Sequence, residues 1–272
     1  MLIDTSEKLP DKSLRPYISH YAGFRLMGAS LGITRTLPSR HVTLMIGLGT
    51  PFIIENKGTF TSFLCGMAAG PNYVHRGKII EGVHIFLNPL GVYALLGLPA
   101  SAFAGQVVNL SDIIGSSAHE LHDRLQEDLP WSSRFGILDN MFIRILKEAS
   151  LSNELIWSWK KLLKSSGNIR ISELSEEIGW SRRHLTEKFI NEIGISPKTL
   201  ARILRFENAC ALIKARHFPL ADIAVESGYY DQPHMTREWQ ALAGCPPMTW
   251  IHEELPFIQD YELSRYNNER PT

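Results

Sequence analysis

The first hundred residues alternate between apolar and polar side chains in several short runs. The alternation is clear over residues 17–26 and 41–48, and shorter apolar runs follow at Phe52–Ile54, 60–64 and 83–87. Glycine and proline separate these runs. A period of two predicts half-buried strands, and short strands at this spacing predict a small sandwich or barrel, which we describe as cupin-like.

The period changes at Pro89. Pro89 can occupy the first turn of a helix that Gly97 can end. Helical spacing follows over residues 119–125 and 135–148 and again near 152–163. The helices at 121–125 and 135–146 are amphipathic, which leaves two alternatives open: they form a dimer face, or they pack on their own domain. Ser-Ser-Gly at residues 165–167 is the predicted domain boundary.

The chain repeats itself between residues 169 and 250. Three patterns recur in order: Leu174-x-x-x-Ile178-Gly179 as Ile223-x-x-x-Ser227-Gly228, Ser181-x-x-His184-Leu185-x-x-x-Phe189 as Asp231-x-x-His234-Met235-x-x-x-Trp239, and Gly194-x-x-Pro197 as Gly244-x-x-Pro247. The first pattern is offset by 49 residues and the other two by 50. The extra residue therefore falls between the glycine and the next helix, where a turn can absorb it.

Each copy of the repeat predicts a helix-turn-helix unit. Gly179 can end the first helix because glycine adopts positive φ without steric cost. Ser181 and Asp231 can cap the second helices by accepting a backbone N–H. Leu185 and Phe189 lie four residues apart and therefore pack the second helix onto the first.

A long helix joins the two units. Pro197 begins it, and its apolar positions continue to about residue 216. At 1.5 Å per residue it spans roughly 25–30 Å. A connecting helix of this length can hold two DNA-reading helices about one DNA turn, ~34 Å, apart, so that they enter successive major grooves.

These residues resemble the AraC/XylS family of transcription regulators over residues 169–250. The motifs that carry the resemblance are SRRHLTEKFINEIGISP, Arg202-x-x-Arg205-x-x-x-Ala209 and DIAVESGYYDQPHMTREW. The resemblance implies a bacterial transcription regulator whose other domain senses a ligand or dimerises. The segments TLPSRHVTLMIGL, NPLGVYALLGLPASAFAGQVVNL and SSRFGILDNMF are similar to the effector-type domain of one branch of that family, but they do not identify the effector.

The candidate DNA contacts lie on the outward arcs of the two second helices. In the first unit we expect Arg183, Thr186 and Glu187 to face bases, with Arg182, His184 and Lys188 nearer phosphate. Arg183 can bind guanine bidentately. For Glu187 two interpretations stay open: accepting from cytosine N4, or pairing with Arg183 across one helical turn.

The second unit carries the equivalent residues Gln232, Pro233, Thr236 and Arg237, of which Arg237 is the best base reader. His234 and the helix N-terminus can bind phosphate. His184 and His234 occupy matching positions, so packing at the helix start is the alternative role for both.

Charge supports a local rather than a general affinity for DNA. The whole chain of 272 residues carries 28 basic and 28 acidic side chains, which excludes a strongly basic coat protein. Residues 161–252 hold 12 Lys and Arg against 10 Asp and Glu, so a few contacts must carry specificity. The three cysteines, Cys65, Cys210 and Cys245, are scattered and suit a reducing compartment. The N-terminus lacks a signal-peptide pattern, so we expect a cytoplasmic, nucleoid-associated protein.

Enzymatic signatures are weak. His41, His75 and His84 are isolated, without the His-x-His spacing of a metal cupin, and no nucleophile elbow or P-loop occurs. We therefore expect no metal, cofactor or catalytic residue. A small-molecule-binding or enzymatic β domain with a helical interaction module remains the alternative function.

The predicted fold is α+β, with a β-rich domain over residues 1–110, helical connectors over 111–164, a tandem helix-turn-helix domain over 165–253 and a polar tail over 254–272. The expected partners are double-stranded promoter DNA, RNA polymerase and a small-molecule effector, with a monomer or a homodimer both open. If the first domain binds a ligand, its polar contacts and walls are expected from these residues: Arg35, Arg40, Phe63, Tyr73, His75, Arg76 and Phe86.

Overall fold

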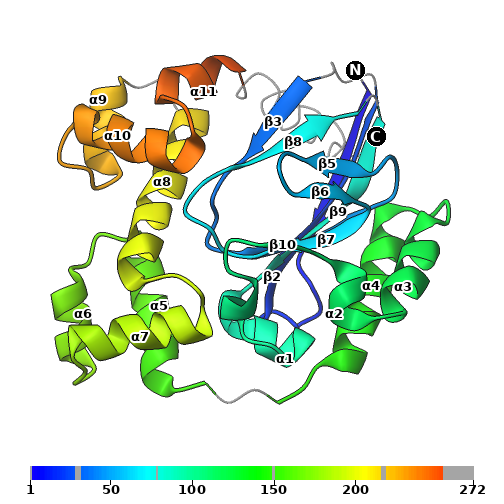
Figure 1. Ribbon diagram of the computed structural model, residues 1–272, viewed down its shortest axis with the longest axis horizontal. Helices are drawn as coiled ribbons and strands as arrows, with labels where there is room; N and C mark the ends of the chain where they lie inside the picture. The colour runs from blue at the N-terminus through cyan, green and yellow to red at the C-terminus, as the bar shows by residue number, and fades with distance from the viewer. Residues whose placement is uncertain (1, 28–31, 78, 149–150, 216–218, 254–272) are drawn as a thin grey trace, which may run out of the picture.

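The computed structural model describes residues 2–27, 32–77, 79–148, 151–215 and 219–253. The polar tail at 254–272 lies outside the described residues, as do the side chains of residues 2, 3 and 76. In Figure 1 a β-sheet domain lies beside a helical domain, and the long helix α8 (Pro197–Ala215) runs along the boundary between them.

The β domain consists of two antiparallel sheets. The larger has the strand order β1-β2-β9-β4-β7-β10 and the smaller the order β3-β8-β5-β6. Their bounds are β1 Leu2–Lys8, β2 Ile18–Met27, β3 Gly32–Thr36, β4 Val42–Gly47, β5 Phe52–Ile54, β6 Gly58–Phe60, β7 Ser62–Cys65, β8 Asn72–Arg76, β9 Ile79–Leu87 and β10 Val107–Asn109. The predicted sandwich or barrel is confirmed as a β-rich N-terminal domain.

Several strands differ from the sequence prediction. The run at 60–64 is divided between β6 and β7, which belong to different sheets. The strands β1, β3 and β8 were not predicted, because their sequences are rich in polar residues. β1 and β3 are edge strands, where one side needs no sheet partner and the apolar pattern is correspondingly weak.

The prediction that the strands are half-buried is wrong for β2. Tyr21 and Phe24 lie on opposite faces and are both buried, because helices cover one face of the large sheet and the second sheet covers the other. A register shift between Ile18 and His20 also places these two residues on opposite faces. Ile18 therefore packs with the helices, whereas the strict alternation had grouped it with His20.

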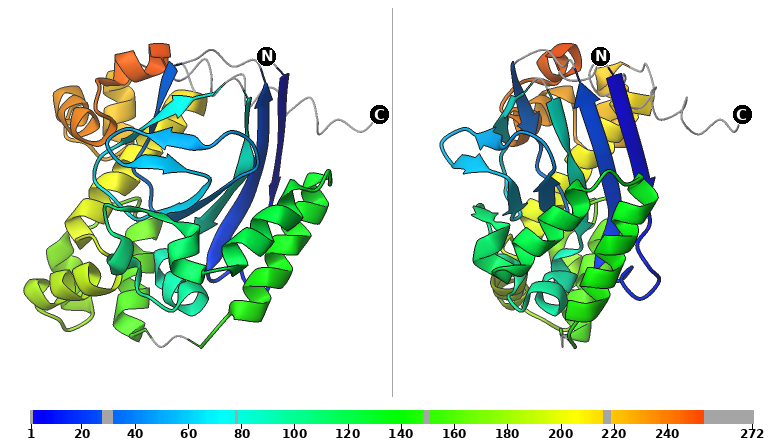
Figure 2. Two further views of the ribbon diagram at one scale, coloured as in Figure 1. Left: turned by 45° about the vertical axis from the view of Figure 1, so that its right-hand side comes forward. Right: turned by 90° about the vertical axis from the view of Figure 1, so that its right-hand side faces the viewer.

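Short helices follow the strands and cover the outer face of the large sheet (Figure 2). They are η1 Pro89–Gly91, α1 Val92–Leu96, η2 Ala100–Phe103, α2 Leu110–Ile114, α3 Ser117–Gln126 and α4 Trp131–Ile145. The Trp131 ring lies against Gly23, where a Cβ would overlap it. Tyr21 donates a hydrogen bond to Asp139 at 2.9 Å and fixes α4 on the sheet. As predicted, Gly97 ends α1 at φ 75°.

In the structure the connector helices α3 and α4 pack on their own domain. This is one of the two alternatives; the other was a dimer face. Leu121 and Leu125 of α3 and Phe135, Leu138 and Phe142 of α4 are all buried in the core. The amphipathic faces of these two helices are thus already covered within the chain.

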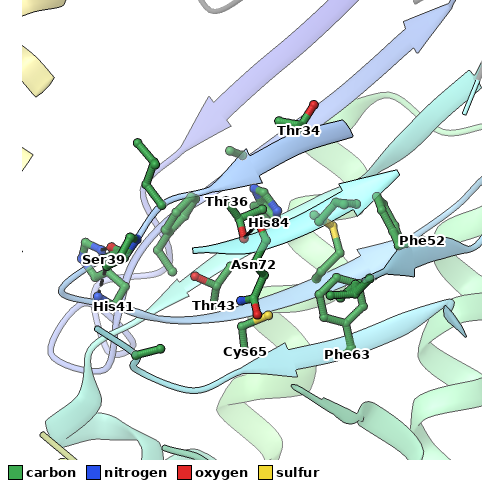
Figure 3. A pocket seen from close by; sticks show the side chains of 18 of the residues that line it. Thr34, Thr36, Ser39, His41, Thr43, Phe52, Phe63, Cys65, Asn72 and His84 are labelled. Atoms are coloured by element: carbon green, nitrogen blue, oxygen red, sulfur yellow. Dashed lines mark hydrogen bonds between the residues drawn. The ribbon is translucent and has the colours of Figure 1, made fainter. Parts of the chain in front are cut away.

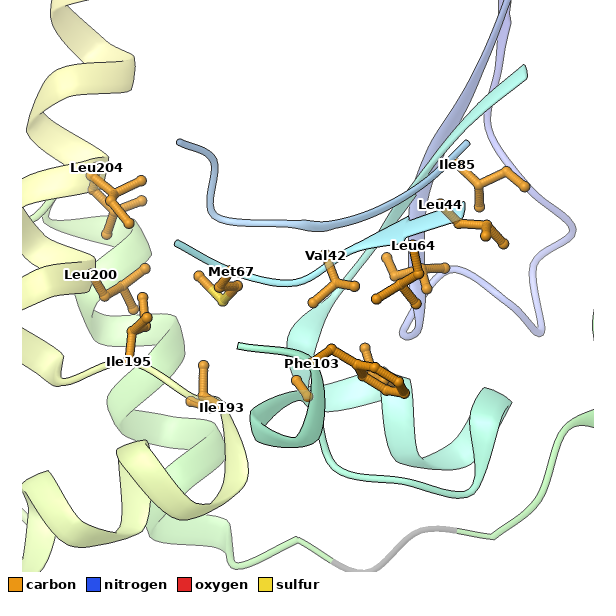
Figure 4. Close-up of a cluster of buried hydrophobic side chains, with 14 of the residues drawn as sticks. Val42, Leu44, Leu64, Met67, Ile85, Phe103, Ile193, Ile195, Leu200 and Leu204 are labelled. Atoms are coloured by element: carbon orange, nitrogen blue, oxygen red, sulfur yellow. The ribbon is translucent and has the colours of Figure 1, made fainter. Parts of the chain in front are cut away.

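The C-terminal helices are α5 Asn153–Lys164, α6 Ile171–Glu177, α7 Arg182–Glu192, α8 Pro197–Ala215, α9 Leu220–Glu226, α10 Gln232–Ala243 and α11 Pro247–Glu253. Their buried side chains join those of the β domain in one continuous hydrophobic cluster. Figure 4 shows Met67 between Val42 of the sheet and Ile195 and Leu200 of the helical domain. The two domains therefore share a core.

Within the described part of the chain, no helix is long and apolar enough to cross a membrane. Cys65, Cys210 and Cys245 form no disulfide bond with one another in the described residues.

Candidate DNA interface and ligand cavity

The first helix-turn-helix unit has the geometry that its sequence predicts. Gly179 adopts φ 71° after α6. The Ser181 hydroxyl then accepts a hydrogen bond from the backbone N–H of His184 at 3.1 Å and caps α7. Leu185 and Phe189 are completely buried. These contacts fix the inward face of α7, and the opposite face is left toward solvent.

The outward face of α7 carries the predicted contacts. Arg182, Arg183 and Glu187 are exposed, while Thr186 and Lys188 are half-buried. The Arg183 Nε donates to Glu187 Oε1 at 2.8 Å, and this hydrogen bond raises the pKa of Arg183. Of the two interpretations for Glu187, the structure therefore has the intrahelical pair, which occupies the Nε of Arg183.

The second unit repeats the arrangement. Asp231 accepts from the backbone N–H of His234 at 2.7 Å and caps α10. Gln232, Pro233 and Arg237 are exposed, and Thr236 is half-buried. Among the described residues Arg237 has no ion-pair partner. Arg183, by contrast, has its Nε paired with Glu187.

The two matched histidines pack at the helix starts. The His184 ring lies edge-on to Trp180 with centroids 4.6 Å apart, and the His234 ring lies edge-on to Tyr229 at 5.4 Å. The His234 Nδ1 also accepts from the backbone N–H of Tyr230 at 3.3 Å. Trp180 and Tyr229 are therefore structural equivalents.

This equivalence identifies Tyr230 as the extra residue of the second unit. Its side chain is 90 % exposed, directly before the cap of α10. Tyr230 was not among the predicted contacts. The signal was present in the sequence, because the change of offset from 49 to 50 occurs at this turn.

A cavity of about 560 Å³ lies between the two sheets of the β domain. Figure 3 shows Phe52 and Phe63 at one end, Ser39 and His41 at the other, and polar side chains between them. Of the residues predicted to bind a ligand, Phe63, His75 and Phe86 line it. Arg35, Arg40 and Tyr73 are not among its lining residues, and the side chain of Arg76 lies outside the described part.

Two histidines of the cavity are held neutral. Burial, with Arg40 and His20 nearby, lowers the pKa of His41 to about 3. Burial and His20 lower the pKa of His84 to about 4. Burial also raises the pKa of the Cys65 thiol to about 11. No cluster of three or more His, Cys, Asp or Glu side chains that could hold a metal ion occurs among the residues described.

The strand-entry segment at residues 39–41 connects this cavity to the long helix. Glu207 of α8 accepts from the Ser39 hydroxyl at 3.1 Å, from the Arg40 backbone N–H at 2.9 Å and from Arg40 Nε at 2.6 Å. The Ser39 hydroxyl also lies 3.3 Å from His41 Nδ1. Lys214, near the C-terminal end of α8, is among the lining residues of the cavity.

The closing turns of both helix-turn-helix units also contact the β domain. Gly194, at φ 95°, lies against Ala104, and Gly244, at φ 73°, lies against Tyr73. Arg35 pairs with Glu253 of α11 at 2.6 Å. The contact between the two domains thus involves Arg35, Arg40 and Tyr73. The sequence analysis had predicted these three residues as ligand contacts and gave no sign of this role.

Comparison with known proteins agrees with this geometry. A family model described as a helix-turn-helix domain matches residues 174–253. The C-terminal domain is therefore a helix-turn-helix domain, and the predicted resemblance to the AraC/XylS family is confirmed.

Two relatives that match part of this chain are named as regulators. The uncharacterized HTH-type transcriptional regulator YbfI of Bacillus subtilis is 35% identical over 68 residues, which cover 25% of this chain and 24% of YbfI. The uncharacterized HTH-type transcriptional regulator SAS0078 of Staphylococcus aureus is 23% identical over 100 residues, 37% of this chain and 13% of that protein. The match thus spans a quarter or less of these relatives.

The whole fold is similar to that of ToxT from Vibrio cholerae. The ToxT structure bound to (E)-4-(8-methylnaphthalen-1-yl)but-3-enoic acid superposes with a TM-score of 0.51 at 13% identity, over 93% of this chain and 99% of ToxT. The structure of an apo ToxT variant gives the same TM-score over 85% of this chain and 97% of that one. This likeness confirms the predicted combination of a β-rich N-terminal and a helical C-terminal domain.

Proposed function

We propose that the protein is a sequence-specific DNA-binding transcription regulator without catalytic activity, which reads two successive major grooves. The observation that carries the proposal is the pair of capped helices α7 and α10, held on one helix, α8, with their outward faces exposed. A helix of 19 residues is roughly 28 Å long, which suits helices that enter grooves about one turn apart.

The proposed base contacts are Arg183 and Arg237, one on each reading helix. Thr186, Glu187, Gln232 and Thr236 share their arcs, and Pro233 adds apolar shape. The phosphate contacts proposed are Arg182, His184, Lys188 and His234. We add Tyr230, whose exposed ring and hydroxyl at the start of α10 have the chemistry of a backbone contact at the groove edge.

We further propose that the β domain binds a small molecule and acts on the DNA-binding domain through α8. The cavity of about 560 Å³ has the size of a ligand site. Glu207 and Lys214 connect α8 to its rim. The ToxT structure that carries a naphthyl butenoic acid has a similar fold, which supports a ligand-binding domain in this chain too.

The test is selection of the purified protein on random duplexes, followed by sequencing and a salt titration of the selected DNA. Two conserved blocks about one helical turn apart are expected. Arg183→Ala and Arg237→Ala should each relax a different block and cost about 1–3 kcal/mol. Arg124→Ala, at an exposed arginine of α3 outside the helix-turn-helix units, is the matched control and should change neither. Absence of any enriched sequence at low salt, for the full chain with and without ligand, would refute the proposal.

A further inference from the structure

The polar groups that line the cavity are overwhelmingly neutral. Thr36 and Asn72 of the small sheet and Thr43 and His84 of the large sheet lie together in the middle of the cavity (Figure 3). Each is a hydroxyl, an amide or an imidazole. We call these four residues the polar girdle; together with Cys65 it lies between the apolar end and the Ser39–His41 end in Figure 3.

The charged residues of the lining do not change this picture. Glu7 and Lys214 belong to the lining, but each already has an interaction within the protein. A ligand carboxylate buried in the girdle would therefore need a cation that is taken from another contact. Burying an unpaired charge costs far more than burying a neutral group that is hydrogen-bonded.

His84 is the group in the girdle that lies between aromatic rings. Its ring lies between Phe24, with centroids 5.4 Å apart, and Phe86, at 5.6 Å. No hydrogen bond reaches either ring nitrogen from the described residues, although the side chain is partly accessible from the cavity. A neutral imidazole has one donor and one acceptor nitrogen, and a buried polar group of this kind is ordinarily hydrogen-bonded.

The apolar end is aromatic. Phe52 and Phe63 meet edge-to-face with centroids 5.6 Å apart, and Phe24 adds a third ring to the lining. Aromatic walls favour an aromatic guest through stacked and edge-on contacts. The girdle, with His84, lies next to this aromatic end. A ligand that fills both parts of the cavity therefore needs a flat apolar body with a polar group at one edge.

We propose that the effector is an uncharged aromatic alcohol of the phenol class, whose rings lie against Phe52 and Phe63 and whose hydroxyl hydrogen-bonds to His84. The inference rests on the proposed ligand-binding role of the β domain. The proposed effector differs in charge from the aryl carboxylic acid in the ToxT structure, because the described girdle offers neutral hydrogen-bonding groups.

The experiment uses three probes with the same bicyclic body: 2-naphthol, 2-naphthoate and naphthalene. Their affinities for the full chain are measured by titration calorimetry at pH 7. We expect 2-naphthol to bind about tenfold tighter than either of the others, which is the effect of about one well-formed hydrogen bond.

Variants assign the polar contact. His84→Phe should lower 2-naphthol affinity about tenfold and leave naphthalene unchanged, and His84→Gln, which keeps a neutral hydrogen-bonding group, should retain most of the affinity. Phe63→Leu should weaken all three probes alike. His119→Phe, at an exposed histidine of α3, is the control for the substitution itself.

Tighter binding of 2-naphthoate, or equal loss of all probes in His84→Phe with full retention of fold, would overturn the proposal. Absence of binding by every probe would overturn it too. Since these titrations contain no DNA, such a failure leaves the duplex selection unaffected, and failure of DNA binding leaves the titrations unaffected.

Discussion

The contact between Arg40 and Glu207 offers a direct measure of how firmly the two domains are joined. Glu207 accepts three hydrogen bonds from Ser39 and Arg40, at 2.6–3.1 Å. The Glu207 side chain is 19% exposed and that of Arg40 is 38% exposed. A hydrogen bond to a charged group contributes about 1.5–3 kcal/mol, and partial exposure reduces this value by solvent screening.

We therefore expect Arg40→Ala to lower the free energy of unfolding by about 1–2 kcal/mol and Glu207→Ala by about 2–3 kcal/mol. Glu207→Ala costs more because it removes the acceptor of the Ser39 hydroxyl and of the Arg40 backbone N–H as well. In the Glu207→Ala background, Arg40→Ala should cost less than about 0.5 kcal/mol, since its partner is already absent.

The assay is urea unfolding of the full chain for the wild type, both single variants and the double variant. Glu177→Ala is the control, because Glu177 forms an exposed ion pair with Lys161 within the helical domain and should cost at most about 1 kcal/mol. If Arg40→Ala costs the same with and without Glu207, the two residues are not coupled and this ion pair does not join the domains.

Three further predictions concern the helix caps, the buried histidines and the inserted tyrosine. Ser181→Ala and Asp231→Ala should each destabilise the fold by about 1 kcal/mol, measured by thermal unfolding with circular dichroism; no change in either would contradict the capping geometry. The pKa values of His41 and His84, about 3 and about 4, lie below the ordinary 6.5. The unfolded chain therefore takes up protons first, and the free energy of unfolding should fall as the pH drops from 6.5 to 4, by about 1.4 kcal/mol per pH unit for each histidine; urea unfolding at pH 7 and 5.5 tests this, and His84→Phe should remove one histidine's share. Tyr230→Ala should weaken binding to the selected duplex about three- to tenfold with unchanged thermal stability, whereas loss of stability without loss of affinity would assign Tyr230 a structural role.

The helix-turn-helix units could be predicted in detail because their determinants are local. The caps Ser181 and Asp231, the glycine at 179 and the buried pair Leu185 and Phe189 each act within about twenty residues of the contacts they make. Periodicity and capping rules describe such contacts directly. The domain limits and the individual DNA contacts stay predictions.

The cavity could not be predicted in the same way. Asn72 and His84 come together from two sheets, and their orientation depends on which sheet each strand joins. On β2 a single register shift reverses the face of Ile18 relative to His20, and such a shift leaves no mark in the apolar pattern. Arg40 was predicted as a ligand contact because a cation can orient a polar ligand. Its partner, Glu207, is 167 residues away in the chain, so no local pattern indicates the pair.

The position of α8 determines what kind of signal the cavity can send. Glu207 lies in the middle of this helix, while Pro197 begins it immediately after the first unit and its far end leads to the second. The Gly194 and Gly244 turns, one at the end of each unit, also rest on the β domain. A ligand that displaces His41 and Ser39 would thus change the contacts that hold α8 and the two turns on the β domain, and leave the caps and buried faces inside each unit intact. The expected effect of the ligand is a change in the spacing and orientation of α7 relative to α10, and hence in the affinity for two-block sites, with single-block affinity unchanged.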